Sequence, residues 1–234
     1  MYPNSISFVI PAYNEQDNIK RSVESAFDFL NSNFSDFEII VVDDGSKDNT
    51  QAICKNLVLQ YGDRVIVLKH PENKGYGAAL RTGLFSARKD LVFYTDADNQ
   101  FDIREINVFM TYVADYDLVI GYRKNRQDRF IRKLCAFVYN RLIFLLFQLD
   151  VKDIDCSFKL FKRPALSLLS IDRDEFLVDT ELLIKSKLNN LKIKQLPVTH
   201  FPRQAGKSTV KLRHIFSTLR DVVFLYKKLK LDKK

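Results

Sequence analysis

The sequence predicts an α/β fold in which helices flank a mostly parallel central sheet, and three observations predict it. Over the first 120 residues, short apolar runs alternate with stretches in which apolar residues recur at helical spacing. The apolar runs are continuous, which is typical of parallel strands buried on both faces. Polar motifs follow three of the runs, and doubly wound sheets bind their ligands at the carboxyl ends of the strands.

Each expected element rests on a local pattern. Apolar runs that end in proline, glycine or polar residues predict strands at residues 6–10, 37–42, 65–68, 91–95 and 117–121. Helical periodicity predicts helices from about residue 15, from about residue 48 and over residues 75–88. The second half is expected to add a long helix, a short strand, a helix and a final strand, at residues 126–149, 158–161, 180–188 and 193–198.

The 234 residues are expected to form a single domain, residues 1–234, whose two halves differ in charge. Residues 1–120 contain 11 Lys and Arg against 18 Asp and Glu, whereas residues 121–234 contain 26 against 11. The acidic half could hold a cation, and the basic half could face phosphate, nucleic acid or an anionic membrane. An unevenly charged, solvated surface explains the same split more simply.

The sequence shows no signal peptide at its start and no run long enough for a transmembrane helix. The longest uninterrupted apolar run is residues 142–147, whereas a helix that spans a bilayer needs about 20 apolar residues. Cys54, Cys135 and Cys156 are far apart and odd in number, so they indicate neither a disulfide framework nor a zinc site. A cytoplasmic location is therefore expected.

Acidic motifs follow the second and fourth expected strands. VDDGS is explained equally by a turn before a helix capped by Asp48 and by carboxylates that accept hydrogen bonds from a nucleobase or ribose. In TDADNQFD, Asp96 and Asp98 flank one residue, and two like charges so close together are unfavourable without a cation. Hard oxygen ligands suit Mg²⁺ or Mn²⁺ shared with a diphosphate, and Gln100 could add a carbonyl oxygen.

Two glycine-containing stretches are candidates for binding phosphate. In NKGYGAALRTG, Gly75 and Gly77 could bring backbone N–H groups to a phosphate, or the small residues could only allow close packing of the helix on the sheet. AGKST at residues 205–209 resembles the end of a Walker A loop, but that motif requires glycine where this chain has Phe201. We therefore reject a phosphate-binding loop of that class.

Taken together, the motifs resemble glycosyltransferase family 2, and within it the polyprenyl-phosphate glycosyltransferases of the dolichol-phosphate mannose synthase group. The matching stretches are PAYNE, VDDGSKDNT, NKGYGAALRTG, TDADNQFD, VIGYR, DCSFKLFKR and HFPRQAGKST. The resemblance implies a GT-A fold, a UDP- or GDP-linked sugar as donor, Mg²⁺ or Mn²⁺ as cofactor, and inverting transfer of a hexose to an undecaprenyl or dolichyl phosphate. It also implies a nucleotide-sugar half at residues 1–122 and an acceptor and membrane half at residues 123–234.

The resemblance assigns roles to individual residues. Donor-binding positions are Pro11, Tyr13, Glu15, Asp43, Asp44, Lys74 and Asp96, with the metal held by Asp98, Gln100 and Asp96. Acceptor or donor phosphates would contact Arg123, Arg203, Lys207 and Ser208. Asp96, Asp98 and Asp155 are the catalytic candidates, although Asp155 could equally form a cap or an ion pair with Lys159 or Arg163.

The chain departs from the family pattern in two places. Ser157 stands where many relatives have glycine, so the local turn is expected to differ. Asp102 and Ile103 stand where close relatives often have prolines, in the loop after the expected metal site.

Residues 129–149 are expected to form an amphipathic helix at a membrane interface. One side is apolar and comprises Ile131, Leu134, Cys135, Val138, Tyr139, Leu142, Leu145, Leu146 and Leu149. Basic and amide side chains interleaved with phenylalanines form the other side, at Arg129, Phe130, Arg132, Lys133, Phe137, Asn140, Arg141, Phe144, Phe147 and Gln148. Such a face suits lipid headgroups, and a surface helix with a few exposed phenylalanines is the alternative.

Residues 211–231 carry a second apolar stripe, followed by a basic end, and are expected either to pack on the domain or to bind anionic lipid. We therefore expect a peripheral enzyme on the inner membrane face. A family-2 transferase for a saccharide or protein hydroxyl is the alternative function. A nucleic-acid-binding module is the third hypothesis, but the sequence has no recognised binding signature and its acidic DAD motif opposes a polyanion.

Overall fold

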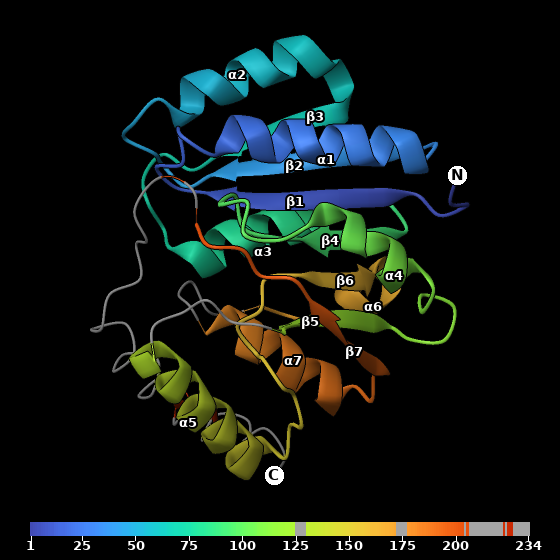
Figure 1. Cartoon of the computed structure of the whole chain (residues 1–234), viewed down its shortest axis with the longest axis vertical. Coiled ribbons are helices and arrows are strands. Elements are labelled where there is room, and N and C mark those ends of the chain that lie inside the picture. Colours follow the sequence, from blue (N-terminus) through green and yellow to red (C-terminus); the bar gives the residue numbers. More distant parts are fainter. Residues whose placement is uncertain (125–129, 172–176, 204, 206–221, 223, 227–234) are drawn as a thin grey trace.

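The computed structural model describes residues 1–124, 130–171, 177–203, 205, 222 and 224–226, and all their side chains except those of residues 130–135. Its centre is a seven-stranded sheet (Figure 1) with the strand order β3-β2-β1-β4-β6-β5-β7. The strands are β1 (Ile6–Ala12), β2 (Phe37–Asp43), β3 (Val65–Lys69), β4 (Leu91–Tyr94), β5 (Leu118–Arg123), β6 (Lys159–Lys162) and β7 (Ile193–Val198). β6 is antiparallel to both of its neighbours and the other pairings are parallel. The mostly parallel α/β sheet is therefore confirmed.

Helices cover both faces of this sheet. The core on one face includes buried side chains of α1 (Ile19–Asn33), α2 (Thr50–Tyr61) and α4 (Ile106–Met110). The core on the other face includes side chains of α3 (Tyr76–Ser86), α5 (Phe130–Phe147), α6 (Arg163–Ser167) and α7 (Val178–Leu188). Alternate residues of a strand supply the two cores: Phe8 and Ile10 face one core, and Val9 faces the other. Burial on both faces explains the continuous apolar runs.

Most expected elements lie within a few residues of the observed ones. The first helix begins at Ile19, because the amides of Asn18 and Ile19 first form a turn on the carbonyl of Glu15. β6 begins one residue later than expected. The short helices α4 and α6 and two 3₁₀ turns, Gly62–Arg64 and Ile103–Glu105, were not expected from the sequence, since five residues or fewer carry no readable period.

The long helix is α5, and only its second half has described side chains. Ile143 is fully buried, and Tyr139, Leu142, Leu146 and Phe147 pack against the same core. Phe137, Val138 and Leu145 are 67%, 55% and 59% exposed. The sequence projection had placed Val138 and Leu145 with Leu142, so the packed seam is rotated from the expected apolar side.

Other predictions on the second half fall partly outside the described residues. Arg129 lies outside them, as do the side chains of Phe130, Ile131, Arg132, Lys133, Leu134 and Cys135. Most of the expected final helix, residues 211–231, also lies outside, but Val222 and Leu225 are buried in the α7-side core. Among the described helices, none combines the length and apolar character that a membrane crossing requires.

Candidate active site

Three motifs meet at one edge of the sheet because β2, β1 and β4 are neighbours and run in the same direction. Hydrogen bonds join the segments that follow these strands. The amide of Glu15 donates to Oγ1 of Thr50 at 2.8 Å, and the amide of Asn14 donates to Oγ of Ser46 at 2.9 Å. Asn99 reaches back from the DAD motif to the carbonyl of Asn18. PAYNE, VDDGS and DAD therefore form one continuous surface.

Asp43 and Asp44, the two carboxylates of VDDGS, have different surroundings. Asp43 is fully buried; its Oδ1 accepts from the amide of Ser46 at 2.9 Å, while its Oδ2 has no hydrogen-bond partner among the described residues. Asp44 accepts from the amides of Lys74 and Gly75, both at 2.9 Å, and pairs with His70 at 2.6 Å. Asp43 can therefore still accept a ligand hydrogen bond, whereas the geometry of Asp44 favours a structural role.

The glycine-containing stretch packs closely and does not present its first amide to an open site. Gly75 precedes α3 with φ of +99°, and its N–H donates to Asp44. A Cβ on Gly83 would lie 2.3 Å from Cγ1 of Val9, so glycine lets α3 approach β1. Close helix–sheet packing therefore accounts for Gly83, and the positive φ before α3 and the bond to Asp44 account for Gly75. The Lys74 side chain is exposed beside this segment.

Asp96 and Asp98 form the acidic centre of the site. Desolvation by burial, with the neighbouring charge of Asp96, raises the pKa of Asp98 to about 7, although Arg203 acts against the shift. Burial also raises the pKa of Asp96, while hydrogen bonds from Ser157 and Tyr76 oppose the rise. Oδ1 of Asp96 is buried and has no hydrogen-bond partner among the described residues.

Arg203 lies over this acidic pair. Its Nη2 contacts both carboxylate oxygens of Glu15 at 2.6 Å, and its Nη1 lies 3.7 Å from Oδ2 of Asp98. The loop that carries it is held by Gln100, whose Nε2 donates to the carbonyl of Phe201 at 2.9 Å. Expected donor, metal and phosphate residues therefore meet here, but Glu15 and Gln100 already bind the arginine loop. Lys207 and Ser208, expected in the same loop, lie outside the described residues.

Arg123 is held in a buried ion pair with Asp153, which was not expected from the sequence. Its Nε and Nη2 each lie 2.6 Å from an oxygen of Asp153, and both side chains are less than a tenth exposed. Burial alone would lower the pKa of Arg123, but hydrogen bonds to Asp153 outweigh burial and raise it. Asp153 therefore sets the direction of an expected phosphate ligand, and the acidic spacing of KDID was the available signal.

Asp155 lies next to this pair, and its side chain is exposed. Surrounding protein and the charge of Asp179 nevertheless raise its pKa to about 6. Among the described residues it makes neither of the ion pairs considered from the sequence: Lys159 binds Asp179 instead, and the charge of Arg163 acts on Asp90.

Lys159, Asp179 and Tyr94 form a buried polar cluster beneath the acidic centre. Nζ of Lys159, which is fully buried, donates to Asp179 and to the carbonyls of Ile154 and Cys156. The Tyr94 hydroxyl donates to the same carboxylate. The cluster fixes the segment before β6 against α7, and the sequence missed it because β6 reads as an ordinary apolar strand.

The charges around the DAD motif fit a divalent cation. The charges of Asp96 and Glu15 raise the pKa of Asp98, and the charge of Asp179 raises that of Asp96. Arg203 acts against the shift of Asp98, and Lys159 against that of Asp96. Among the described residues, no group of three or more His, Cys, Asp or Glu side chains forms a complete metal cage. Asp96 and Asp98 therefore suit an open site completed by ligand oxygens.

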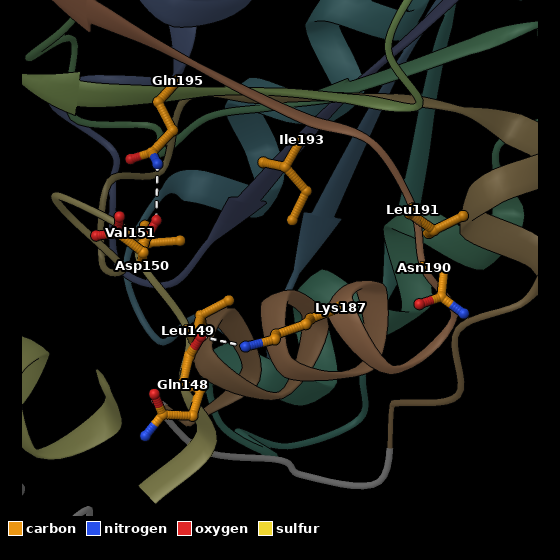
Figure 2. Close-up of a pocket in the computed structure, with 9 residues that line it drawn as sticks. All are labelled: Gln148, Leu149, Asp150, Val151, Lys187, Asn190, Leu191, Ile193 and Gln195. Atoms are coloured by element: carbon orange, nitrogen blue, oxygen red, sulfur yellow. Dashed lines mark hydrogen bonds between the residues drawn. The ribbon is translucent and has the colours of Figure 1, made fainter. Parts of the chain in front are cut away.

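A separate cleft of about 360 Å³ lies beside β7 (Figure 2) and contains none of the expected site residues. It is lined by Gln148, Leu149, Asp150, Val151, Lys187, Asn190, Leu191, Ile193 and Gln195. Lys187 donates to the carbonyls of Phe147 and Gln148, and Gln195 donates to the carbonyl of Asp150. These polar groups brace the end of α5 against α7 and β7.

Comparisons with known proteins agree with this arrangement. The model of the family described as Glycosyl transferase family 2 matches residues 7–169. The dolichyl-phosphate beta-glucosyltransferase ALG5D of Trichomonas vaginalis is 30% identical, over 94% of this chain and 73% of its own. The human dolichyl-phosphate beta-glucosyltransferase is 28% identical, over 82% of this chain and 66% of its own. The dodecaprenyl-phosphate galacturonate synthase of Rhizobium johnstonii is 27% identical, over 93% of this chain and 65% of its own.

The fold is also that of solved structures. A crystal structure of glucosyl-3-phosphoglycerate synthase from Mycobacterium tuberculosis, in complex with Mn²⁺, UDP and phosphoglyceric acid, matches with a TM-score of 0.71 at 22% identity. The match covers 94% of this chain and 76% of that one. The expected GT-A fold is confirmed, and the chain belongs to glycosyltransferase family 2 and is a glycosyltransferase.

Proposed function

We propose that the chain transfers a hexose, with inversion, from a UDP- or GDP-linked sugar to an undecaprenyl or dolichyl phosphate at the cytoplasmic face of a membrane. The observation that carries the donor side is the half-buried Asp96–Asp98 pair at the end of β4, in which Oδ1 of Asp96 is buried and unpartnered among the described residues. The acceptor side is supported by relatives named for dolichyl-phosphate and dodecaprenyl-phosphate substrates. Residues 1–122 would then bind the donor, and residues 123–234 the acceptor and membrane, within a single domain.

The donor nucleoside is proposed to lie over the ends of β1 and β2. Pro11 is buried and Tyr13 half-buried at the end of β1, and the unpartnered Oδ2 of Asp43 faces no competing donor among the described residues. A carboxylate oxygen in this position can accept a hydrogen bond from a ribose hydroxyl or a base N–H. Lys74 lies exposed beside this surface and is proposed to meet a donor phosphate.

Mg²⁺ or Mn²⁺ is proposed to bind Asp98 and Asp96, with Gln100 close by. When bound, such a cation neutralises charge on the diphosphate leaving group. Asp98 must lose its proton to ligate, and Arg203 favours the charged carboxylate, since it lies 3.7 Å away. Arg203 would also contact phosphate once the negative charges of Glu15 and Asp98 are shared with the cation.

A phosphate acceptor simplifies the chemistry that the protein must perform. Its second pKa is about 6, so it is already anionic near neutral pH and needs no general base. A phosphate oxygen forms the bond to the anomeric carbon, and the bond to the donor diphosphate breaks with its electron pair. The protein must therefore hold two anions together, and Arg123 and Arg203 would serve, with Asp153 and Glu15 directing them.

Asp155 supports a second candidate function. An exposed carboxylate whose pKa is raised to about 6 can accept a proton from a hydroxyl acceptor near neutral pH. This favours transfer to a saccharide or protein hydroxyl, which requires a base.

A panel of nucleotide sugars tested on a short polyprenyl phosphate and on the matching free polyprenol distinguishes the two functions. We expect product, detected by mass spectrometry of the lipid, only with the phosphate. In Asp155→Asn, phosphate glycosylation should persist within about tenfold, because no general base is needed. If the unaltered chain instead glycosylates polyprenol and its phosphate equally, and Asp155→Asn loses this activity, the acceptor is a hydroxyl and the second function is supported.

Asp98→Ala tests the cation. We expect transfer to fall by at least about a hundredfold, the scale of losing one preorganised electrostatic contact, while the chain remains folded. Asp115→Ala, an exposed carboxylate before β5, is the control and should remain active. Undiminished transfer by Asp98→Ala with a chelator present would contradict the metal assignment.

A further inference from the structure

The antiparallel strand β6 places a serine against the first carboxylate of the DAD motif. β6 pairs with β4 so that Lys159 lies opposite Tyr94. Extending this register two residues beyond the strand ends places Ser157 opposite Asp96. Side chains two residues apart share a face of a strand, so Ser157 and Asp96 project on the same face as Lys159 and Tyr94.

The contact between them is short and buried. Oγ of Ser157 donates to Oδ2 of Asp96 at 2.6 Å, and Ser157 is 4% exposed. The Tyr76 side chain acts, like Ser157, to lower the pKa of Asp96 against the effect of burial. The other oxygen, Oδ1, is buried without a hydrogen-bond partner among the described residues. An unpartnered carboxylate oxygen costs free energy, and a bound ligand would recover that cost.

The segment that carries Ser157 is itself held in place by the buried side chain of Lys159. Lys159 holds the carbonyls of Ile154 and Cys156, and Asp179 on α7 holds Lys159. The serine hydroxyl therefore has a fixed position relative to β4, and it restrains rotation of the Asp96 carboxylate about its Cβ–Cγ bond.

We propose that Ser157 is a positioning residue that turns the unpartnered oxygen of Asp96 toward the donor nucleotide and its divalent cation. This inference rests on the proposed function, since it requires a nucleoside diphosphate and a cation at the DAD motif. Ser157 acts through Asp96 and does not itself contact the donor.

The test is the affinity of the full chain for Mn²⁺ with UDP or GDP, measured by calorimetry. Ser157→Ala should weaken binding of whichever pair the unaltered chain binds by about tenfold, the scale of one hydrogen bond to a charged group. Ser157→Thr, which keeps the hydroxyl, should bind within about threefold of the unaltered chain.

Ser7→Ala is a matched control. Oγ of Ser7 donates to Oε1 of Glu38 at 2.5 Å, and Ser7 is fully buried at the start of β1, at the opposite edge of the sheet from the site. Ser7→Ala removes a buried serine–carboxylate hydrogen bond and also the oxygen that accepts from the amides of Arg88 and Lys89. It should therefore lower the thermal midpoint at least as much as Ser157→Ala does and leave Mn²⁺–nucleotide affinity unchanged.

Affinity of Ser157→Ala within twofold of the unaltered chain overturns the proposal, as does equal weakening in Ser157→Thr. If Ser157→Ala does not fold, the comparison of Ser157→Thr with Ser157→Val decides, because these isosteric side chains differ in the hydroxyl. Equal Mn²⁺–nucleotide affinities of the two variants overturn the proposal, and weaker affinity in Ser157→Val alone supports it. Absence of any Mn²⁺–UDP or Mn²⁺–GDP binding by the unaltered chain would contradict the proposed donor and, with it, this inference.

Discussion

At the residue scale, the site is defined by carboxylates that burial keeps from ionising easily. Burial raises the pKa of Asp98 to about 7 and also raises the pKa of Asp96. Arg203 limits the shift of Asp98, and hydrogen bonds from Ser157 and Tyr76 limit the shift of Asp96. Without a bound cation, this concentration of negative charge costs stability. The raised pKa values of Asp96 and Asp98 therefore lower the free energy of unfolding near neutral pH, and the proposed cation would offset that loss.

This cost predicts a pH dependence in the metal-free chain. The pKa of Asp98 is about 7 when folded and about 3.9 when unfolded, so the folded chain holds the proton more tightly. Between these values stability falls as pH rises, because the folded state holds a proton that the unfolded state has lost, and folding must take up that proton from an ever lower proton concentration. Relative to Asp98→Asn, the free energy of unfolding should fall by on the order of 1–2 kcal/mol from pH 5.5 to pH 7.5.

Chemical denaturation of both proteins in a chelator measures this difference. Asp102→Asn is the control, since its hydrogen bonds with Arg104 lower the pKa of Asp102. The contribution of the Asp102 carboxylate to stability is complete above the unfolded pKa and is lost only as pH falls below that value. The difference in free energy of unfolding between the unaltered chain and Asp102→Asn should therefore not change between pH 5.5 and 7.5. A pH-independent difference between the unaltered chain and Asp98→Asn would contradict the raised pKa.

At the element scale, the loops after β2 and β3 depend on one close backbone approach. Gly45 has φ of +68°, and a Cβ there would lie 2.4 Å from the carbonyl carbon of Glu72. The same approach places Asp44 against the amides of Lys74 and Gly75. The VDDGS loop and the start of α3 therefore form one unit.

Gly45→Ala should lower the free energy of unfolding by roughly 3 kcal/mol or more, because it adds a backbone clash to the left-handed strain. Gly62→Ala is the matched control: φ is +58° there, but no atom lies within 4 Å of an added Cβ. With ψ of −142° the backbone of Gly62 still favours glycine, so this variant should cost about 1–3 kcal/mol from backbone strain alone. Urea denaturation of the two variants measures both values, and equal losses would show that the clash is relieved by movement of the loop.

At the scale of the whole molecule, one end carries an exposed apolar helix face. Figure 1 shows α5 at the opposite end of the molecule from α2. Phe137, Val138 and Leu145 on α5 are more than half exposed, with the guanidinium of Arg141 5.2 Å from the ring centre of Phe144 on the same helix. This combination of apolar side chains and a cation suits the headgroup boundary of an anionic membrane.

The double substitution Phe137→Ser with Leu145→Ser should therefore reduce binding to vesicles that contain anionic lipid by at least about tenfold in a sedimentation assay, since each exposed large side chain contributes more than 1 kcal/mol when buried in lipid. Leu59→Ser, on α2 and 84% exposed in the unaltered chain, is the control and should bind normally. Equal binding by all three proteins would exclude this face of α5 as the membrane contact.

The sequence by itself determined the order and type of the main elements and the three strand-end motifs. These follow from periodicity and from local turn chemistry, which depend on near neighbours in the chain. The edge shared by PAYNE, VDDGS and DAD could also be predicted, because parallel strands bring their carboxyl ends together. The resemblance of these motifs led to glycosyltransferase family 2, which the comparisons confirm.

Tertiary structure alone decided which side chains meet. The antiparallel register of β6 places Ser157 against Asp96, and packing of α7 places Asp179 beneath both. Packing likewise pairs Arg123 with Asp153 and turns Val138 of α5 outward. The physical reason is that pairing register and helix rotation depend on contacts between residues distant in sequence, and local sequence patterns contain no information on such contacts.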